Sequence, residues 1–172
     1  MTVAADRGLD SGAGGKGRIR QRGLYFEEFE LDTVYEHSPG RTISEADNTI
    51  FSLLTMNTQA LHLDEEWSKL TDYGSRLVNS MFTLSTVVGS SVAQLTQGTI
   101  VANLGLTDVT FPIPVRVGDT IRSETTVLSK RLSRSRPDRG IVEFEHTALN
   151  QRGEIVATAK RTTMMQRIPR SE

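Results

Sequence analysis

The sequence predicts an α+β fold, in which a curved antiparallel sheet wraps around one long uncharged helix at about residues 79–97. Two observations support this. No charged residue occurs between Leu77 and Thr107, and a helix without charges on any face is expected to be buried. Beyond this stretch, apolar and polar residues alternate in several runs, which is the period of half-buried strands joined by short turns.

The length of 172 residues suits one domain with a proper core and is too short for two ordinary domains. We expect a single domain at residues 24–168, with residues 169–172 as a short tail. Residues 1–23 are rich in glycine and arginine and bury too little apolar surface to fold, so a disordered tail is expected. The N-terminus has no signal-peptide pattern, and we expect a cytoplasmic location.

Charge and composition exclude several functions. Twenty basic and twenty-one acidic residues give a net charge of -1, so no nucleic-acid or membrane partner is expected. The absence of cysteine excludes disulfides, thiolate nucleophiles and cysteine-based zinc sites. His37, His62 and His146 lack metal-ligand spacing, and we expect no metal.

The first half of the domain should contain two helices before the long one. Proline and glycine punctuate residues 35–40, and residues 41–43 continue in extended form. Ser44 is a helix cap followed by acidic residues, and this helix should run to about Thr55. Its apolar residues recur at helical spacing, which predicts that they pack inward: Ile50, Phe51, Leu53 and Leu54.

A polar loop at residues 57–64 follows, and Asp64 is expected to cap a short helix that ends near residues 73–75. The long helix then begins near Asn79. It is almost long enough to span a membrane, but its many Ser, Asn and Gln side chains would be costly in lipid. Its small residues instead favour close packing against a sheet.

Strands are expected in the rest of the chain. Residues 100–106 and 108–111 form one extended run, and residues 121–132, 140–150 and 154–165 alternate as half-buried strands. Residues 150–153 have the composition of a hairpin turn. Consecutive strands with short turns predict antiparallel pairing.

The residues from roughly Phe26 to Met165 resemble the MaoC-like hydratases and dehydratases of the hot-dog fold. That family has Asp-x-Asn-Pro-x-His-x-Asp after its first helix, and this chain has Asn57-Thr58-Gln59-Ala60-Leu61-His62-Leu63-Asp64. The spacing is kept, but Asn57 replaces the aspartate and Gln59-Ala60 replaces Asn-Pro. Further segments resemble the branch of mesaconyl-CoA hydratases, also called β-methylmalyl-CoA dehydratases: Pro39–Thr42, Ala46–Asn48, Leu53–Gln59, Leu77–Ser80 and Ser133–Pro137.

Hydration of a 2-enoyl thioester needs a base, and an imidazole such as His62 can take and return a proton near neutral pH. Asn57 could orient the water but cannot accept its proton. Backbone N–H groups of Val78 and Asn79, at the helix N-terminus, are candidates for stabilising the thioester oxyanion. The resemblance adds Ser85 near the thioester, although its sequence context also fits a helix-packing serine.

Arg134 and Arg136 lie in a basic hairpin-like segment that resembles the family and could hold the phosphates of coenzyme A. A solvated loop is the alternative for these arginines. Asp64 is most simply a helix cap.

Three functions are compatible with the sequence: an enoyl-CoA hydratase/dehydratase, a hot-dog thioesterase, or a non-catalytic acyl-CoA-binding module. Thioesterases of this fold resemble one another in having an acidic residue on or beside the central helix, and residues 77–107 have none. No cofactor is expected beyond the coenzyme A of the substrate. The fold and an unpaired sheet edge both predict a homodimer or a higher assembly of dimers.

Overall fold

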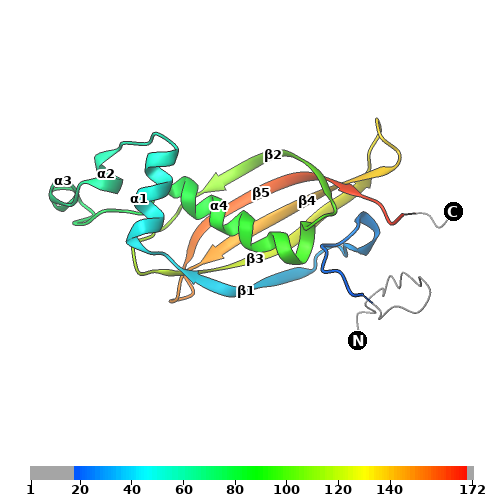
Figure 1. Ribbon diagram of the computed structural model, residues 1–172, viewed down its shortest axis with the longest axis horizontal. Helices are drawn as coiled ribbons and strands as arrows, with labels where there is room; N and C mark the ends of the chain where they lie inside the picture. Colours follow the sequence, from blue (N-terminus) through cyan, green and yellow to red (C-terminus); the bar gives the residue numbers. More distant parts are fainter. Residues whose placement is uncertain (1–17, 170–172) are drawn as a thin grey trace.

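The computed structural model describes residues 18–169, and its centre is one five-stranded antiparallel sheet with the order β1-β3-β4-β5-β2. The sheet curves around one long helix (Figure 1), which confirms the predicted α+β architecture. The strands are β1 (Val34–Thr42), β2 (Ile100–Thr110), β3 (Thr120–Leu132), β4 (Arg139–Leu149) and β5 (Ile155–Gln166).

The short helices and the β3–β4 loop lie at opposite ends of the molecule. Helices α1 to α3 lie at one end of the sheet, and the β3–β4 loop lies at the other end near both ends of the described chain (Figure 1). None of the helices within residues 18–169 is long and apolar enough to cross a membrane. The helices are η1 (Phe26–Glu28), α1 (Glu45–Leu54), α2 (Ala60–Leu63), α3 (Glu65–Lys69), α4 (Ser80–Ser91) and the π-helical turn η2 (Val92–Thr96).

Helix α4 is the predicted uncharged helix, and η2 continues it to Thr96. Asn79 caps it, accepting a hydrogen bond from the Met81 N–H at 3.0 Å. The prediction that the helix is buried all round is wrong for the described chain, because Met81 is 49% exposed and Ser85 is also exposed. One face packs on the sheet, and its small and apolar residues make that close contact possible: Thr83, Leu84, Val87 and Ser91.

Helix α1 begins at the predicted cap, Ser44, whose side chain accepts a hydrogen bond from the Asp47 N–H. Its inward face differs from the prediction. The buried residues are Asn48 and Ser52, whereas the leucines and isoleucine of the apolar stripe point outward, with exposures of 56% for Ile50, 58% for Leu53 and 78% for Leu54. Polar side chains occupy the inward face because the main-chain groups around them need hydrogen-bond partners.

Strand β1 is longer than the sequence indicated. Its pairing with β3 runs from Val34 to Thr42, with a register shift between His37 and Arg41. Pro39 lies within that shift, where a residue without an N–H does not break a ladder hydrogen bond. An edge strand tolerates such an interruption, so the segment with Pro and Gly remains part of the sheet.

Two apolar clusters fill the space between helix and sheet. One lies near the start of α4 and includes Val78, Val87 and Val156. The other includes Phe29, Leu95 and Phe144, and Phe29 meets Phe144 edge to face with ring centroids 5.3 Å apart.

The N-terminal segment packs against the second cluster. The Gly23 N–H donates to the Gln97 carbonyl at 2.7 Å, and a Cβ on Gly23 would lie 2.5 Å from the Leu95 carbonyl carbon. The chain is therefore already in contact with the domain at Arg22, which binds Glu28, and at Gly23. Most of the predicted N-terminal tail, residues 1–17, and most of the predicted C-terminal tail, residues 170–172, lie outside the described residues.

Candidate functional site

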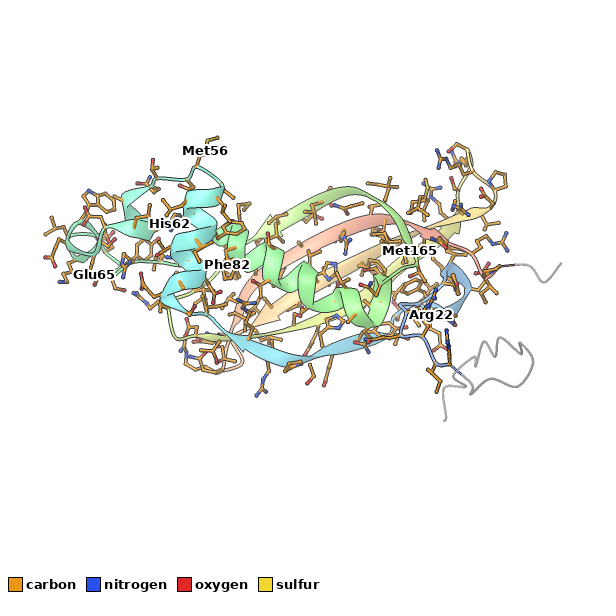
Figure 2. The ribbon with its side chains drawn as sticks, viewed as in Figure 1. Arg22, Met56, His62, Glu65, Phe82 and Met165 are labelled. Carbon is orange, nitrogen blue, oxygen red and sulfur yellow. The ribbon has the colours of Figure 1, made fainter. Side chains whose placement is uncertain are left out.

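A pocket of about 250 Å³ lies between α2, the start of α4 and the segment before β3. His62 is on its wall, at the end of the molecule that carries α1 to α3 (Figure 2). Most of its other walls are apolar, with two hydroxyl groups from the first turn of α4. The lining residues are Leu61, His62, Tyr73, Leu77, Val78, Ser80, Thr83, residues 111–115 and Val156.

His62 lies on α2, a short helix in the segment where the sequence predicted only a loop. The side chain is half-buried. Its Nδ1 lies 3.0 Å from the Leu77 carbonyl oxygen, and because a carbonyl only accepts, Nδ1 must carry the proton of the neutral ring. No hydrogen bond from residues 18–169 reaches Nε2, so this nitrogen keeps a free lone pair that can accept a proton.

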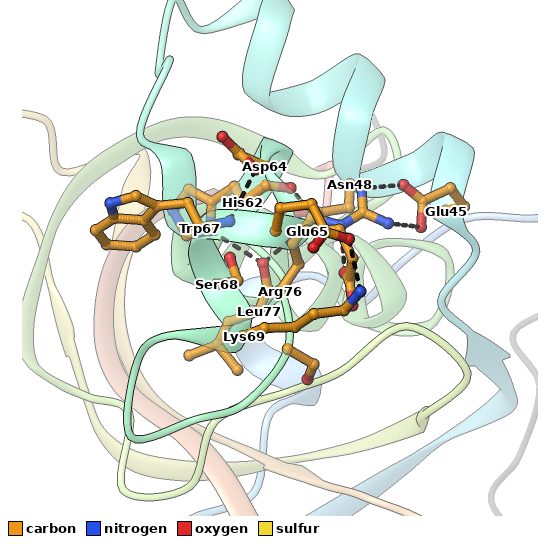
Figure 3. A network of polar contacts seen from close by, with 12 residues as sticks. Glu45, Asn48, His62, Asp64, Glu65, Trp67, Ser68, Lys69, Arg76 and Leu77 are labelled. Atoms are coloured by element: carbon orange, nitrogen blue, oxygen red, sulfur yellow. Dashed lines mark hydrogen bonds and ion pairs between the residues drawn. The ribbon is translucent and has the colours of Figure 1, made fainter.

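Asn48 holds the main chain around His62 (Figure 3). This fully buried side chain donates from Nδ2 to the carbonyl oxygens of His62 at 3.1 Å and Leu77 at 3.3 Å. Its Oδ1 accepts the Asn79 N–H at 2.9 Å. One amide on α1 therefore fixes α2, the carbonyl that orients the imidazole, and the start of α4.

Arg76 forms a second connection among the same elements (Figure 3). Its Nη2 donates to Glu45 at 2.9 Å and its Nε donates to Glu65 at 2.9 Å. The hydrogen bond from Arg76 is the main cause that lowers the pKa of Glu65. This exposed network ties α1 to α3 across the segment that leads into α4.

The two backbone amides that we expected to hold the oxyanion are both engaged within the chain. The Val78 N–H donates to the Val115 carbonyl at 2.9 Å, and the Asn79 N–H donates to Asn48. The expectation that these amides are free is therefore wrong, because the fold uses them to fix the entry into α4. Ser80 and Thr83, at the start of α4, line the pocket instead.

The walls of this pocket, as residues 18–169 form them, include neither Asn57 nor Ser85. The Asn57 Oδ1 accepts the Gln59 N–H at 3.2 Å, which closes a local turn before α2. Ser85 lies on the other flank of α4, in a separate groove of about 400 Å³ beside Phe51 and Phe82. The structure thus brings His62 together with Val78 but not with Asn57 or Ser85.

Arg134 and Arg136 lie in the β3–β4 loop, at the end of the molecule opposite His62 (Figure 1). Val156 lines the His62 pocket, and Gln166 pairs with Arg139 beside the arginine loop. At about 3.3 Å per residue, these two positions on β5 are roughly 30 Å apart. The two arginines and the His62 imidazole of one chain therefore lie too far apart to contact the same part of a ligand.

Sequence reasoning missed Asn48 as part of the site. The available signal was a pair of small polar residues one turn apart, Asn48 and Ser52, within a helix whose other residues are largely apolar. The same reasoning missed Ser80 and Thr83, because nothing in an uncharged helix distinguishes a hydroxyl that faces a pocket from one that faces packing. Among residues 18–169, no group of three or more His, Cys, Asp or Glu residues is arranged to hold a metal ion.

Comparisons with known proteins place these features in context. A family model described as "MaoC like domain" matches residues 27–150. A mesaconyl-CoA hydratase of Haloarcula marismortui is 30% identical over 156 residues, which cover 89% of this chain and 42% of the relative. An (R)-specific enoyl-CoA hydratase of Rhodospirillum rubrum is 29% identical over 144 residues, covering 82% of this chain and 91% of the relative. The chain spans about two fifths of the length of the mesaconyl-CoA hydratases it matches.

Solved structures agree in fold. A MaoC-like dehydratase of Rhodospirillum rubrum superposes with a TM-score of 0.75 at 28% identity, covering 86% of this chain and all of that structure. A Mycobacterium tuberculosis protein described as a double hotdog fold has a TM-score of 0.79 at 23% identity, covering 90% of this chain and 47% of that structure. The hot-dog fold expected from the sequence is thereby confirmed.

Proposed function

Because the chain belongs to the MaoC-like domain family, we propose that it is a hydratase/dehydratase that adds or removes water across the double bond of a 2-enoyl-CoA thioester. The observation that carries this proposal is the His62 imidazole on the wall of a small pocket, with Nδ1–H held by Leu77 and Nε2 free. The names of its relatives support a hydratase rather than a binding module.

The geometry suits His62 as the proton carrier. In hydration, Nε2 accepts a proton as the water oxygen bonds to the β carbon, and the electron pair of the double bond passes toward the thioester oxygen. The imidazolium then returns a proton to the α carbon, so one water is added and the histidine is regenerated. The Leu77 carbonyl keeps its hydrogen bond to Nδ1–H throughout and stabilises the charged ring.

Charge that develops on the thioester oxygen needs a donor in the same pocket. We assign this role to the first turn of α4, where the Ser80 hydroxyl lines the wall and the helix dipole favours negative charge. Val78 then contributes an apolar wall rather than an amide. Asn57 closes the turn that leads into α2, and by this route it would position His62 without touching the substrate.

The relatives support a short branched or dicarboxylic acyl group, such as mesaconyl. A pocket of about 250 Å³ is in keeping with a short chain. A panel of enoyl-CoA thioesters of different length and branching would identify the preferred acyl group, followed by the loss of the enoyl ultraviolet absorbance.

His62→Ala tests the catalytic assignment. We expect hydration to fall by at least about 100-fold, the usual contribution of a positioned acid–base group, while the thermal unfolding temperature stays near that of the parent. His37→Ala is not a suitable control because His37 is buried. Thr58→Ala is suitable, because Thr58 is exposed and lies in the turn just before α2. Near-native turnover by His62→Ala would refute the assignment. Release of free thiol would instead indicate a thioesterase, and saturable binding with neither signal would indicate a binding module.

We also propose a homodimer in which each copy contributes its arginine loop to the site of the other. The β2 edge is free in the described chain, and a two-fold axis there would extend the sheet and reverse the second copy end to end. The arginine loop of one copy would then lie toward the His62 end of its partner. Arg134 and Arg136, too far from His62 of the same chain, could hold coenzyme A phosphates in this arrangement.

Mixed dimers test this arrangement. One chain carries His62→Ala, and the other carries Arg134→Ser with Arg136→Ser. If the arginines act across the interface, the mixed dimer regains one intact site and shows clearly more activity than either parent dimer. If no activity returns on mixing, the arginines do not serve the partner's site.

The expected cytoplasmic location stays a prediction, which cell fractionation of the tagged chain would check.

A further inference from the structure

A row of polar side chains crosses the inner face of the sheet beneath the C-terminal half of the long helix. It takes one buried residue from each of four neighbouring strands, with exposures of 7%, 0%, 0% and 6%. Gln94 on η2 flanks the row at one end and Asn103 on β2 flanks it at the other. None of these residues lines the His62 pocket. The four buried members are His37, Thr125, His146 and Arg161.

The hydrogen bonds of this row have one direction. The Gln94 Oε1 can only accept, so His37 Nδ1 donates to it at 2.8 Å. Neutral His37 then offers a lone pair at Nε2, to which the Thr125 hydroxyl donates at 2.7 Å. The Thr125 oxygen in turn accepts from His146 Nδ1–H at 2.8 Å. Burial lowers the pKa of each histidine and so favours the neutral form of both rings.

Two buried polar atoms of this row, on β4 and β5, have no hydrogen-bond partner among the described residues: His146 Nε2 and Arg161 Nη1. The direction of the row makes the first a bare acceptor, and a guanidinium nitrogen is always a donor. Arg161 uses its Nε on Asn103 at 3.1 Å. A buried donor and a buried acceptor left unpaired would each cost free energy.

The chemistry of these two atoms selects their ligand. Arg161 pairs with Phe144, two residues from His146 on β4, and its charge is, after burial, the next cause that lowers the pKa of His146, so one ligand can contact both side chains. An anion would suit Arg161 but would meet the lone pair of His146, and a cation would meet the guanidinium. A molecule that accepts one hydrogen bond and donates another satisfies both groups. We propose that His146 and Arg161 hold one internal water, which accepts from Nη1–H and donates to Nε2, and which completes a polar row across all five strands.

The unmodified chain allows a direct test by NMR. In protein labelled with ¹⁵N, long-range correlation of the imidazole nitrogens should show both His37 and His146 protonated at Nδ1. A cross-relaxation peak should connect a long-lived water to the His146 ring. A proton on Nε2 of His146, or the absence of the water peak, would overturn the proposal.

Arg161→Met supplies a second test, because it removes the donor but keeps much of the side-chain volume. The water peak at His146 should disappear while His37 keeps its Nδ1 proton. Arg122→Met, on an exposed position of β3, is the matched control and should leave both signals unchanged. A water peak that persists in Arg161→Met would refute the role of the guanidinium. If that variant does not fold, the spectra of the unmodified chain still decide.

Discussion

At the scale of single residues, the side chain of Asn48 satisfies three main-chain groups that surround the His62 imidazole. An apolar residue there would remove the Asn48 hydrogen bonds to the His62 carbonyl and the Asn79 N–H, and would leave the Leu77 carbonyl with the His62 ring alone. The polar inward face of α1 is therefore a requirement of the site, even though the outward face carries the leucines.

Asn48→Ala should lower the free energy of unfolding by about 1–3 kcal/mol, the cost of unsatisfied buried groups, and should also reduce hydration because Leu77 is no longer fixed. Chemical unfolding and steady-state kinetics measure the two effects. Thr49→Ala, on a less buried face of the same helix, should change neither. Full stability in Asn48→Ala would show that water replaces the amide without loss.

His146 should make the protein sensitive to acid. Burial, followed by the nearby Arg161 and His37, lowers its pKa from 6.5 to about 3. Below pH 6.5 the unfolded chain binds a proton that the folded chain does not, so stability falls as pH decreases toward 3, by about 1.4 kcal/mol per pH unit at most.

Unfolding curves between pH 7 and pH 4 measure this dependence. His146→Gln removes the titrating group and should make stability depend less steeply on pH, whatever its effect at neutral pH. An equal slope in both proteins would show that other groups cause the acid sensitivity.

At the scale of elements, the N-terminal segment packs onto the sheet through close contacts that only glycine permits. A Cβ on Gly140, at the start of β4, would lie 1.9 Å from Cδ2 of Phe26. The ring therefore sits directly on the backbone of the strand and helps to close the second apolar cluster.

Gly140→Ala should displace the Phe26 ring and destabilise the protein by about 1–3 kcal/mol, as overpacking does. Gly89→Ala is the matched control, because a Cβ on this glycine of α4 meets nothing within 4 Å. There, helix propensity predicts a gain of up to about 1 kcal/mol. Thermal unfolding of both variants gives the comparison, and a stable Gly140→Ala would mean that η1 moves without cost.

At the scale of the whole molecule, the β2 strand is both a free edge and an apolar surface. Val101 is 37% exposed, Leu104 is 50% exposed and Leu106 is 39% exposed. Unpaired backbone groups beside such side chains are a template for another strand. This is the physical basis for expecting two copies to join here.

Leu104→Lys should shift the protein toward monomer, because a charge would be buried where the two edges meet. Val34→Lys places the same charge on the other edge strand, where Val34 is 54% exposed, and should leave the dimer intact. Light scattering after size exclusion measures the mass of each. A monomeric parent protein, or a Leu104→Lys variant of unchanged mass, would contradict an interface on β2.

The sequence by itself determined the class of fold, the uncharged helix, the caps at Ser44 and Asp64, and His62 as the candidate base. The first three depend on local patterns: a 31-residue stretch without charge, residues suited to caps, and strand alternation. His62 depends on the resemblance of residues 57–64 to the family segment. Such patterns act over a few residues, so they are readable without knowing what lies across the core.

Only the tertiary structure decided which of the candidate groups meet. It placed Asn48 against His62 and engaged the Val78 and Asn79 amides. It also turned Ile50, Leu53 and Leu54 of α1 outward and set the β3–β4 loop with Arg134 at the far end from α2. The reason is physical: a buried polar group must find partners wherever the chain brings them. Those partners come from residues 14 to 37 positions away in the sequence, and no local pattern encodes that distance.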